Sequence, residues 1–346
     1  MLSSMSMNHA SQIISCCPPP SSIVRLAYYY PPSDSIHSSP GSPRCRSEKY
    51  NTLVAMKSTI EHTSRGALVD RTTQRWVQVT GRRVALDECP WLEGPVGDVD
   101  VIGGDFFARF ADREGLMMLT NGPPRGLVEN FTALAGPYCD PTQVDAQVAE
   151  FYEQTSEYEF DVWSEWRGGF RPFGNALAAI FSRRLQQLNV PLSPLDMSQG
   201  ISTSVIQLVD PAGAVQQTAW VREIVASKRT LYAGSYSLCR VPGFDGPCVK
   251  VAFPLPNGSA NVIMQPESAS DGSFTVRCSG RSFGDPGFYF FVGAEQGQGW
   301  ARYLKALKED IRVYVDPRGH LNADHNLQIR GATFLRLHYR IRRRTS

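Results

Sequence analysis

Residues Leu327 to Ile341 read Leu-Gln-Ile-Arg-Gly-Ala-Thr-Phe-Leu-Arg-Leu-His-Tyr-Arg-Ile, and their character alternates regularly. One set of alternate positions is mainly apolar: Leu327, Ile329, Gly331, Thr333, Leu335, Leu337, Tyr339 and Ile341. The other set is mainly basic: Gln328, Arg330, Ala332, Phe334, Arg336, His338 and Arg340. Because successive side chains of a strand point to opposite faces, this stretch predicts one long antiparallel strand with a dry face and a basic face.

The same period of two runs through the sequence from residue 201 onward. The predicted strands are Thr203–Val209, Thr218–Val225, Thr230–Leu238, Cys248–Phe253, Ala260–Met264, Phe274–Cys278, Phe288–Val292 and Ile311–Val315. Asn257-Gly258 and Asp271-Gly272 lie between them and are favoured hairpin dipeptides. The pattern therefore indicates antiparallel strands joined by short turns.

Helical periodicity dominates the preceding region, 105–190. We expect helices to start at Pro141 behind an Asp140 cap, to span Glu157–Trp166 with apolar residues at steps of four, and to span Ala176–Leu188. A further helix is expected at Trp300–Lys308. Nearer the N-terminus, Arg75–Thr80 and Arg83–Leu86 suggest short strands.

These elements together predict an α+β fold. Its C-terminal half, 201–341, would form a strongly curved antiparallel sheet or a barrel, because a long flat sheet leaves aggregation-prone edges. The helical region 105–190 would cover it, and both would belong to a single domain at 66–345.

Residues 1–60 differ from the rest of the chain. They are rich in Ser and Pro, so we expect a disordered extension that cannot bury enough apolar surface to fold. An over-long gene start, with translation from Met56, is an alternative, and a transit peptide is a less favoured one. No stretch approaches the roughly 18 apolar residues needed to span a bilayer, which favours a soluble, cytoplasmic protein.

The charge balance argues against a nucleic-acid partner. The 346 residues carry 35 Lys and Arg against 33 Asp and Glu, a formal net charge of +2, whereas nucleic-acid binders usually show a strongly basic domain. The hydrophobic content of 42% is typical of globular proteins. A small-molecule ligand is the expected partner, and the sequence identifies no protein partner.

The eight cysteines form no CxxC pair, so no zinc site, other metal or cofactor is expected. Cys239 and Cys248 flank a predicted hairpin connection and would face one another across two strands. In an oxidising compartment they would be the candidate disulfide; two reduced thiols are the favoured alternative.

The segment from Asp316 to His325 is the richest in functional side chains. His320, Asp324 and His325, together with His338 on the last strand, are candidate acid–base or metal-binding groups. Their spacing matches no known ligand pattern. Turn chemistry explains Asp316 better, because the sequence Asp-Pro-Arg-Gly is typical of a turn, and loop positions would suit Asp324 as well.

Two further sets of residues are candidate ligand-binding groups. Trp163, Trp166, Arg167 and Arg171 could form a rigid loop that clamps an anion, or a helix corner whose rings fill the core. Arg336 and Arg340 flank His338 and would make a cationic pocket if their face pointed inward. The outward alternative is commoner, because antiparallel sheets usually keep one wet face.

Three functions remain open on these grounds. The first is a module that binds a small apolar or amphipathic ligand inside the curved sheet. The second is an enzyme that acts on a small acidic substrate through His, Asp and Arg groups near the C-terminus. The third is a protein-interaction module.

Overall fold

The computed structural model describes residues 68–97, 105–120, 122–167, 201–224 and 230–344. The chain divides into two units, Met1–Glu61 and His62–Ser346, and every described residue belongs to the second. Three predictions lie outside the described residues: the disordered extension 1–60, the helix 176–188, and the placement of Arg171.

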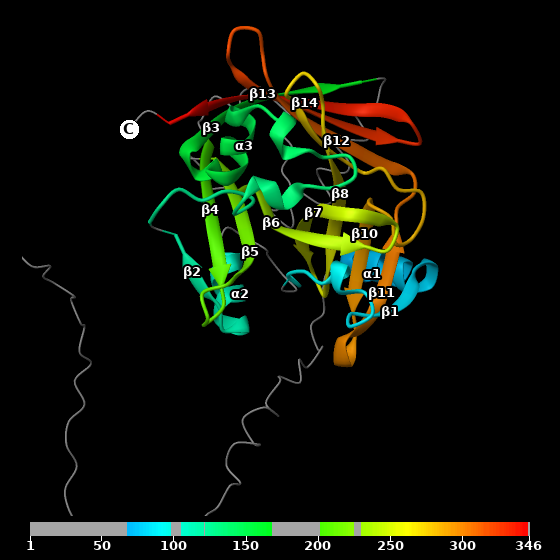
Figure 1. Ribbon diagram of the computed structural model, residues 1–346. Coiled ribbons are helices and arrows are strands. Elements are labelled where there is room, and N and C mark those ends of the chain that lie inside the picture. The colour runs from blue at the N-terminus through cyan, green and yellow to red at the C-terminus, as the bar shows by residue number, and fades with distance from the viewer. Residues whose placement is uncertain (1–67, 98–104, 121, 168–200, 225–229, 345–346) are drawn as a thin grey trace, which may run out of the picture. The chain divides into compact units, whose positions relative to one another are not determined.

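The described chain is built mostly of strands (Figure 1). The strands are β1 (Arg82–Ala85), β2 (Met117–Leu119), β3 (Tyr158–Trp166), β4 (Ile201–Val209), β5 (Val215–Ile224), β6 (Thr230–Val241), β7 (Phe244–Leu255), β8 (Gly258–Ser268), β9 (Phe274–Arg277), β10 (Phe288–Gly293), β11 (Gln298–Tyr303), β12 (Leu307–Val315), β13 (Leu321–Ile329) and β14 (Ala332–Arg343). The helices are α1 (Leu68–Thr80), α2 (Phe106–Glu114) and α3 (Ala146–Glu153), with short 3₁₀ turns at Pro90–Leu92, Phe131–Leu134, Pro141–Gln143, Thr155–Glu157 and Glu295–Gly297.

All the strand ladders are antiparallel, as the alternation predicts. The main path through the sheet runs β2-β4-β5-β6-β7-β8-β9-β12-β13-β14-β3, and β10, β11 and β1 branch from β8. In the described part of the chain this path ends at β2 and at β3 without closing. The barrel form of the prediction is therefore not supported, and the antiparallel sheet is confirmed.

The last strand is shorter than predicted, because a hairpin divides it. Arg330 and Gly331 have φ values of +50° and +83°, and they turn the chain between β13 and β14. A two-residue turn of this kind requires left-handed backbone at both positions. Next to the turn Ile329 pairs with Ala332, and a register shift between Leu327 and Gln328 then brings odd-numbered residues opposite one another, as Leu327 is to Leu335 and His325 to Leu337. Because the alternation continues in the sequence on both sides of Arg330 and Gly331, it gave no sign of the turn between them.

The predicted helix Glu157–Trp166 is wrong, because Tyr158–Trp166 forms strand β3 at one edge of the sheet. Steps of four fit a strand as well as a helix, since four is a multiple of two. The signal that separates them is the row Glu159, Asp161 and Glu165, which alternates with the apolar positions. The region 105–190 is therefore not wholly helical.

Three other local predictions are also corrected. Arg75–Thr80 belongs to helix α1 rather than to a strand, with Val77 fully buried on its inner side. Trp300–Lys308 contains the end of strand β11 and a turn, where a helix was predicted. Asp140 does cap a turn, by accepting a hydrogen bond from Thr142 N at 3.0 Å, but α3 begins only at Ala146.

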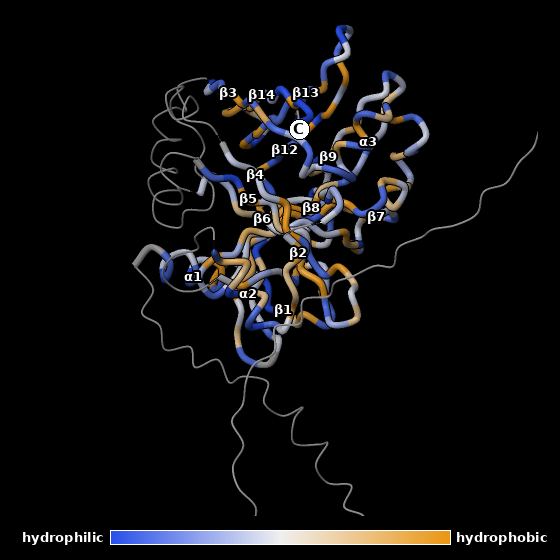
Figure 2. The backbone as a smooth tube through the Cα atoms, turned by 90° about the vertical axis from the view of Figure 1, so that its left-hand side faces the viewer, coloured by the Kyte–Doolittle hydropathy of each residue, from blue (hydrophilic) through white to orange (hydrophobic). Residues whose placement is uncertain are grey.

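Helix α2 and the concave side of the sheet lie on opposite faces of β4–β6. Phe106, Phe107 and Phe110 of α2 pack on Leu208 and Val221, which point away from the neighbouring Trp220. Coloured by hydropathy, β13 and β14 alternate between hydrophilic and hydrophobic residues (Figure 2). Such alternation is expected of strands with one buried face.

Among the helices that the structure describes, none combines the length and apolar character needed to cross a membrane.

Candidate ligand-binding site

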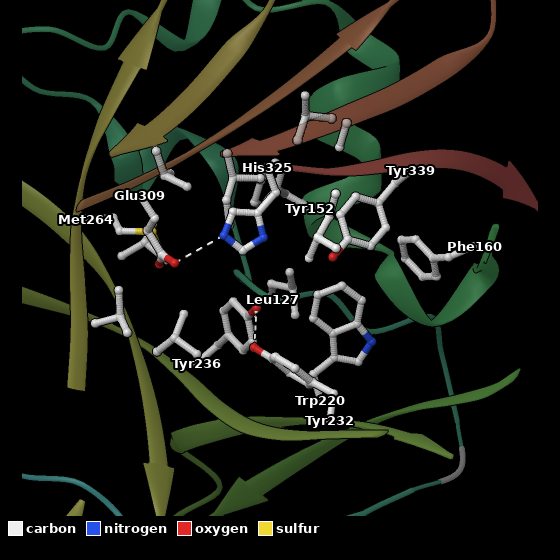
Figure 3. A pocket seen from close by; sticks show the side chains of 18 of the residues that line it. Leu127, Tyr152, Phe160, Trp220, Tyr232, Tyr236, Met264, Glu309, His325 and Tyr339 are labelled. Atoms are coloured by element: carbon white, nitrogen blue, oxygen red, sulfur yellow. Dashed lines mark hydrogen bonds and ion pairs between the residues drawn. The ribbon is translucent and has the colours of Figure 1, made fainter. Parts of the chain in front are cut away.

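One face of the sheet lines a cavity of about 200 Å³. Strands β5 to β10 and β12 to β14 all contribute side chains to it, so the sheet bends around the cavity. Most of these side chains are aliphatic or aromatic, among them Val251, Val262, Met264, Leu337 and Ile341. Figure 3 shows Met264, Tyr236 and Tyr339 among the side chains that surround the space.

Helix α3 and strand β3 supply aromatic rings to the same cavity. Phe151 packs edge-on against Tyr152 and Phe160, with ring centroids 5.2 and 5.8 Å apart. The helix is positioned at its start by Asp145, whose side chain accepts a hydrogen bond from Gln147 N at 2.8 Å. This capping interaction satisfies a backbone donor that the first turn leaves unpaired.

Two tyrosines of β6 bring hydroxyl groups into the apolar surroundings. Tyr232 and Tyr236 are four residues apart, so they share one face of the strand, and their hydroxyl oxygens lie 2.7 Å apart (Figure 3). Burial raises the pKa of Tyr232 well above its ordinary value and raises that of Tyr236 too. Both phenols are therefore neutral hydrogen-bonding groups.

Arg222 of β5 is a buried cation that lines the cavity. Its guanidinium carbon lies 4.0 Å from the ring centroid of Trp220, 4.3 Å from that of Phe160 and 5.5 Å from that of Tyr339. Its Nε is buried without a hydrogen-bond partner. Burial raises the pKa of Tyr339, and the positive charge of Arg222 and a hydrogen bond with it oppose that rise. The cation is thus surrounded by aromatic faces.

A histidine and a carboxylate meet in the same cavity. His325 Nε2 lies 3.1 Å from Glu309 Oε2, and the two side chains are 17% and 9% exposed. Their strands, β13 and β12, are paired, with His325 opposite Ile311 and Glu309 opposite Leu327. The pair is held in place by sheet register, and Figure 3 shows both groups directed into the cavity.

The four predicted catalytic candidates do not meet at one site, and only His325 lines the cavity. His338 and Asp324 lie on the opposite face from His325, where His338 Nδ1 is 2.7 Å from Asp324 Oδ1. The Trp163 ring stacks on His338 with centroids 5.9 Å apart. Asp324 lies in strand β13, so its predicted loop position is wrong.

His320 belongs to the turn that joins β12 to β13. The Asp316 carboxylate accepts hydrogen bonds from Arg318 N and His320 N, both at 2.9 Å, as the turn explanation requires. These bonds lower the pKa of Asp316. His320 Nδ1 lies 3.4 Å from the same carboxylate on an exposed side chain, away from the cavity lining.

None of the predicted ligand-binding residues that the structure describes lines the cavity. Arg336 and Arg340 take the outward orientation, and acidic residues of β3 lie opposite the basic row of β14. The cross-strand neighbours are Arg336 and Glu165, Arg340 and Asp161, and Arg342 and Glu159.

Three further candidates belong to β3 and the residue that follows it. Trp163 is 54% exposed, and Trp166 packs against Phe334. Arg167 forms an ion pair with Glu165 at 3.0 Å. The tryptophan contacts join β14 to the edge strand β3, and none of the three side chains lines the cavity.

The sequence interpretation missed Arg222 and Glu309, although both leave a signal. Each is a charged residue at an alternate position that is otherwise apolar: Arg222 follows Trp220 by two residues, and Glu309 precedes Ile311 by two. A charge in the dry register of a strand is unusual enough to mark a functional site, because an isolated buried charge is costly.

The cysteines and possible metal ligands add little to the site. Cys239 and Cys248 face one another across β6 and β7, as predicted, and both are free thiols. Burial raises their pKa values to about 11 and about 12. Over the described ranges, no group of three His, Cys, Asp or Glu side chains is arranged to hold a metal ion.

Comparison with curated proteins gives a distant similarity. The chain is 26% identical over 241 residues to the "Uncharacterized membrane protein YndJ" of Bacillus subtilis (strain 168). The match covers 69% of this chain and 41% of that protein. No protein-family model and no solved structure matches the chain.

Proposed function

We propose that the chain is a binding module for a small apolar or amphipathic ligand, held in the cavity that β5–β10 and β12–β14 line. The observation that carries the proposal is a mainly apolar cavity of about 200 Å³ with a few polar groups at defined positions. Such pockets are the usual form of small-molecule sites.

The cavity volume limits the size of the ligand. A cavity of about 150 Å³ lined by Leu, Ile and Phe takes up benzene. The cavity of this chain is only moderately larger, at about 200 Å³, so it suits one aromatic ring with a short substituent, or a chain of similar volume. Larger lipids would need the surrounding side chains to move.

Alkylbenzenes of increasing length test this proposal. We expect ethylbenzene to raise the unfolding temperature of the wild-type protein. Val262→Ala, which enlarges the cavity, should shift the preference toward butylbenzene. Val221→Ala is the matched control, because Val221 is equally buried but packs on α2 at the other face of the sheet.

Two results would contradict a binding cavity. One is that no alkylbenzene stabilises the wild-type protein. The other is that Val221→Ala changes ligand preference as much as Val262→Ala does, because the response would then reflect general loosening rather than the size of this space.

A second candidate function, catalysis, rests on the His325–Glu309 pair. An imidazole beside a carboxylate is suited to general acid–base chemistry when both face a bound molecule. The test is to incubate small-molecule extracts with the wild-type protein and with His325→Gln and compare them by mass spectrometry. Conversion of a compound by the wild type alone supports an enzyme, and recovery of every compound unchanged with both proteins supports a binding module.

A further inference from the structure

We propose that the cavity selects ligands that carry a carboxylate, and that Arg222 is the residue that recognises it. This inference rests on the proposed binding function and assigns the ligand's chemical class. The ligand would be an aryl or short alkyl carboxylate with its anionic end at Arg222 and its apolar part among the aliphatic side chains.

The first observation is a buried positive charge without a negative partner. Arg222 is 9% exposed, and no ion pair of the described residues includes it. A guanidinium does not lose its proton in proteins, so the charge persists when it is buried. The aromatic faces around it offset part of the desolvation cost. A ligand carboxylate would supply the missing opposite charge and could accept two parallel N–H bonds.

The second observation concerns hydrogen-bond donors. Arg222 Nε and Trp220 Nε1 are both buried without a partner, and both residues line the cavity. Neither group can accept a hydrogen bond. Buried donors are rarely left unsatisfied, so the two together indicate that an acceptor belongs beside them. A carboxylate offers only acceptors.

The third observation fixes the orientation of the ligand. Glu309, the acidic residue of the cavity lining, has an oxygen 3.1 Å from His325 Nε2 and forms no ion pair with Arg222. Repulsion between like charges disfavours a second carboxylate near Glu309. The hydroxyl of Tyr339, which is hydrogen-bonded with Arg222, adds another polar group at the cationic end. The anion would therefore lie at the Arg222 end.

Three probes of similar shape test the inference by isothermal titration: 3-phenylpropanoate, 3-phenylpropanamide and butylbenzene. We expect the wild-type protein to bind the carboxylate about 10- to 100-fold more tightly than the amide, as hydrogen bonds to charged groups imply. Arg222→Met should abolish that difference while retaining butylbenzene binding. Met is chosen because it keeps an unbranched apolar side chain among the rings.

Arg336→Met is the matched control. Arg336 is also partly buried with an unpartnered Nε, but it lies on the outward face of β14. The Arg336→Met variant should therefore keep the wild-type preference for the carboxylate over the amide. Arg222→Lys keeps the positive charge but lacks the planar guanidinium, so it should retain only part of the preference for the carboxylate. It provides a second test of the inference if the Met variant does not fold.

The outcomes separate the two proposals. If butylbenzene binds but the carboxylate binds no better than the amide, or if the preference survives Arg222→Met, carboxylate selection is wrong and the binding cavity stands. If none of the three probes binds the wild-type protein, the binding function fails together with the inference that depends on it.

Discussion

Strands β13 and β14 carry two histidine–carboxylate pairs on opposite faces. His325 meets Glu309 inside the cavity at 3.1 Å, with side chains 17% and 9% exposed. His338 meets Asp324 on the outer face at 2.7 Å, with side chains 31% and 33% exposed. The two pairs have the same chemistry and differ mainly in their access to water.

Exposure to solvent determines how much each pair contributes to stability. On the outer face, water can replace either partner, so the shorter contact carries a small net free energy. In the cavity, loss of one partner leaves the other buried with nothing to bind. Contact distance is therefore a poor guide to energetic weight, and burial is the better one.

Removal of the buried carboxylate should have the largest effect. We expect Glu309→Ala to lower the free energy of unfolding by about 3 kcal/mol, because His325 loses its buried partner. Urea unfolding followed by circular dichroism measures this. The control is Glu309→Leu combined with His325→Leu, which replaces the whole pair by apolar groups and should recover most of the loss. If Glu309→Ala lowered the free energy of unfolding by less than about 1 kcal/mol, the buried pair would contribute no more to stability than an exposed one.

The hairpin turn joins the two strands that carry these pairs, and its disruption should have the second largest effect. Gly331→Ala places a side chain at φ +83°, which should cost about 1 kcal/mol in unfolding free energy. No neighbouring atom lies within 4 Å of the added Cβ, so backbone strain is the whole cause. Arg330→Asn is the control and should be neutral, because Asn tolerates left-handed backbone. Equal costs for both would contradict this explanation.

Disruption of the outer pair should have a smaller effect. Asp324→Ala and His338→Ala should each cost under about 1 kcal/mol, with a coupling free energy of about 0.5 kcal/mol in a double-mutant cycle. The same cycle on Glu309 and His325 provides the comparison. A coupling on the outer face as large as that in the cavity would show that exposure does not govern these pairs.

The smallest effect should come from the turn between β12 and β13, and it should appear only in acid. Hydrogen bonds from His320 N and Arg318 N lower the pKa of Asp316, so the native state holds this carboxylate ionised at a pH where the unfolded chain takes up a proton. The resulting stabilisation is complete above the unfolded pKa of about 3.9 and is lost as pH falls through the native value. Asp316→Asn should therefore flatten the decline of unfolding free energy below about pH 4. If the unfolding free energies of the wild type and of Asp316→Asn fell in parallel below about pH 4, the stabilisation would not come from Asp316.

Strand positions could be predicted well wherever the residue pattern fitted a strand and did not also fit a helix. The eight strands expected between 203 and 315 all occur, because period-two patterning is the direct consequence of a sheet with one buried face. The errors fell where a pattern fits two structures. The apolar steps of four in Tyr158–Trp166 suit a helix or a strand, and pairing with β14 decided for the strand.

The candidate site was harder to predict, because its parts come from distant strands. His325 could be identified as a candidate from its residue type, but its partner Glu309 is 16 residues away, and Arg222 is farther still. Local spacing favoured the cluster His320, Asp324 and His325. Alternation within β13 directs Asp324 and His325 to opposite faces, so sequence proximity was misleading.

The sequence by itself determined the antiparallel strands of the C-terminal half and the separation of dry and charged faces, because side-chain alternation is a local property of the backbone. Only the tertiary structure decided that the sheet stays open in the described part of the chain and that Arg222, Glu309 and His325 line one cavity. Which residues meet in the cavity depends on pairing between strands far apart in the chain, and no local pattern carries that information.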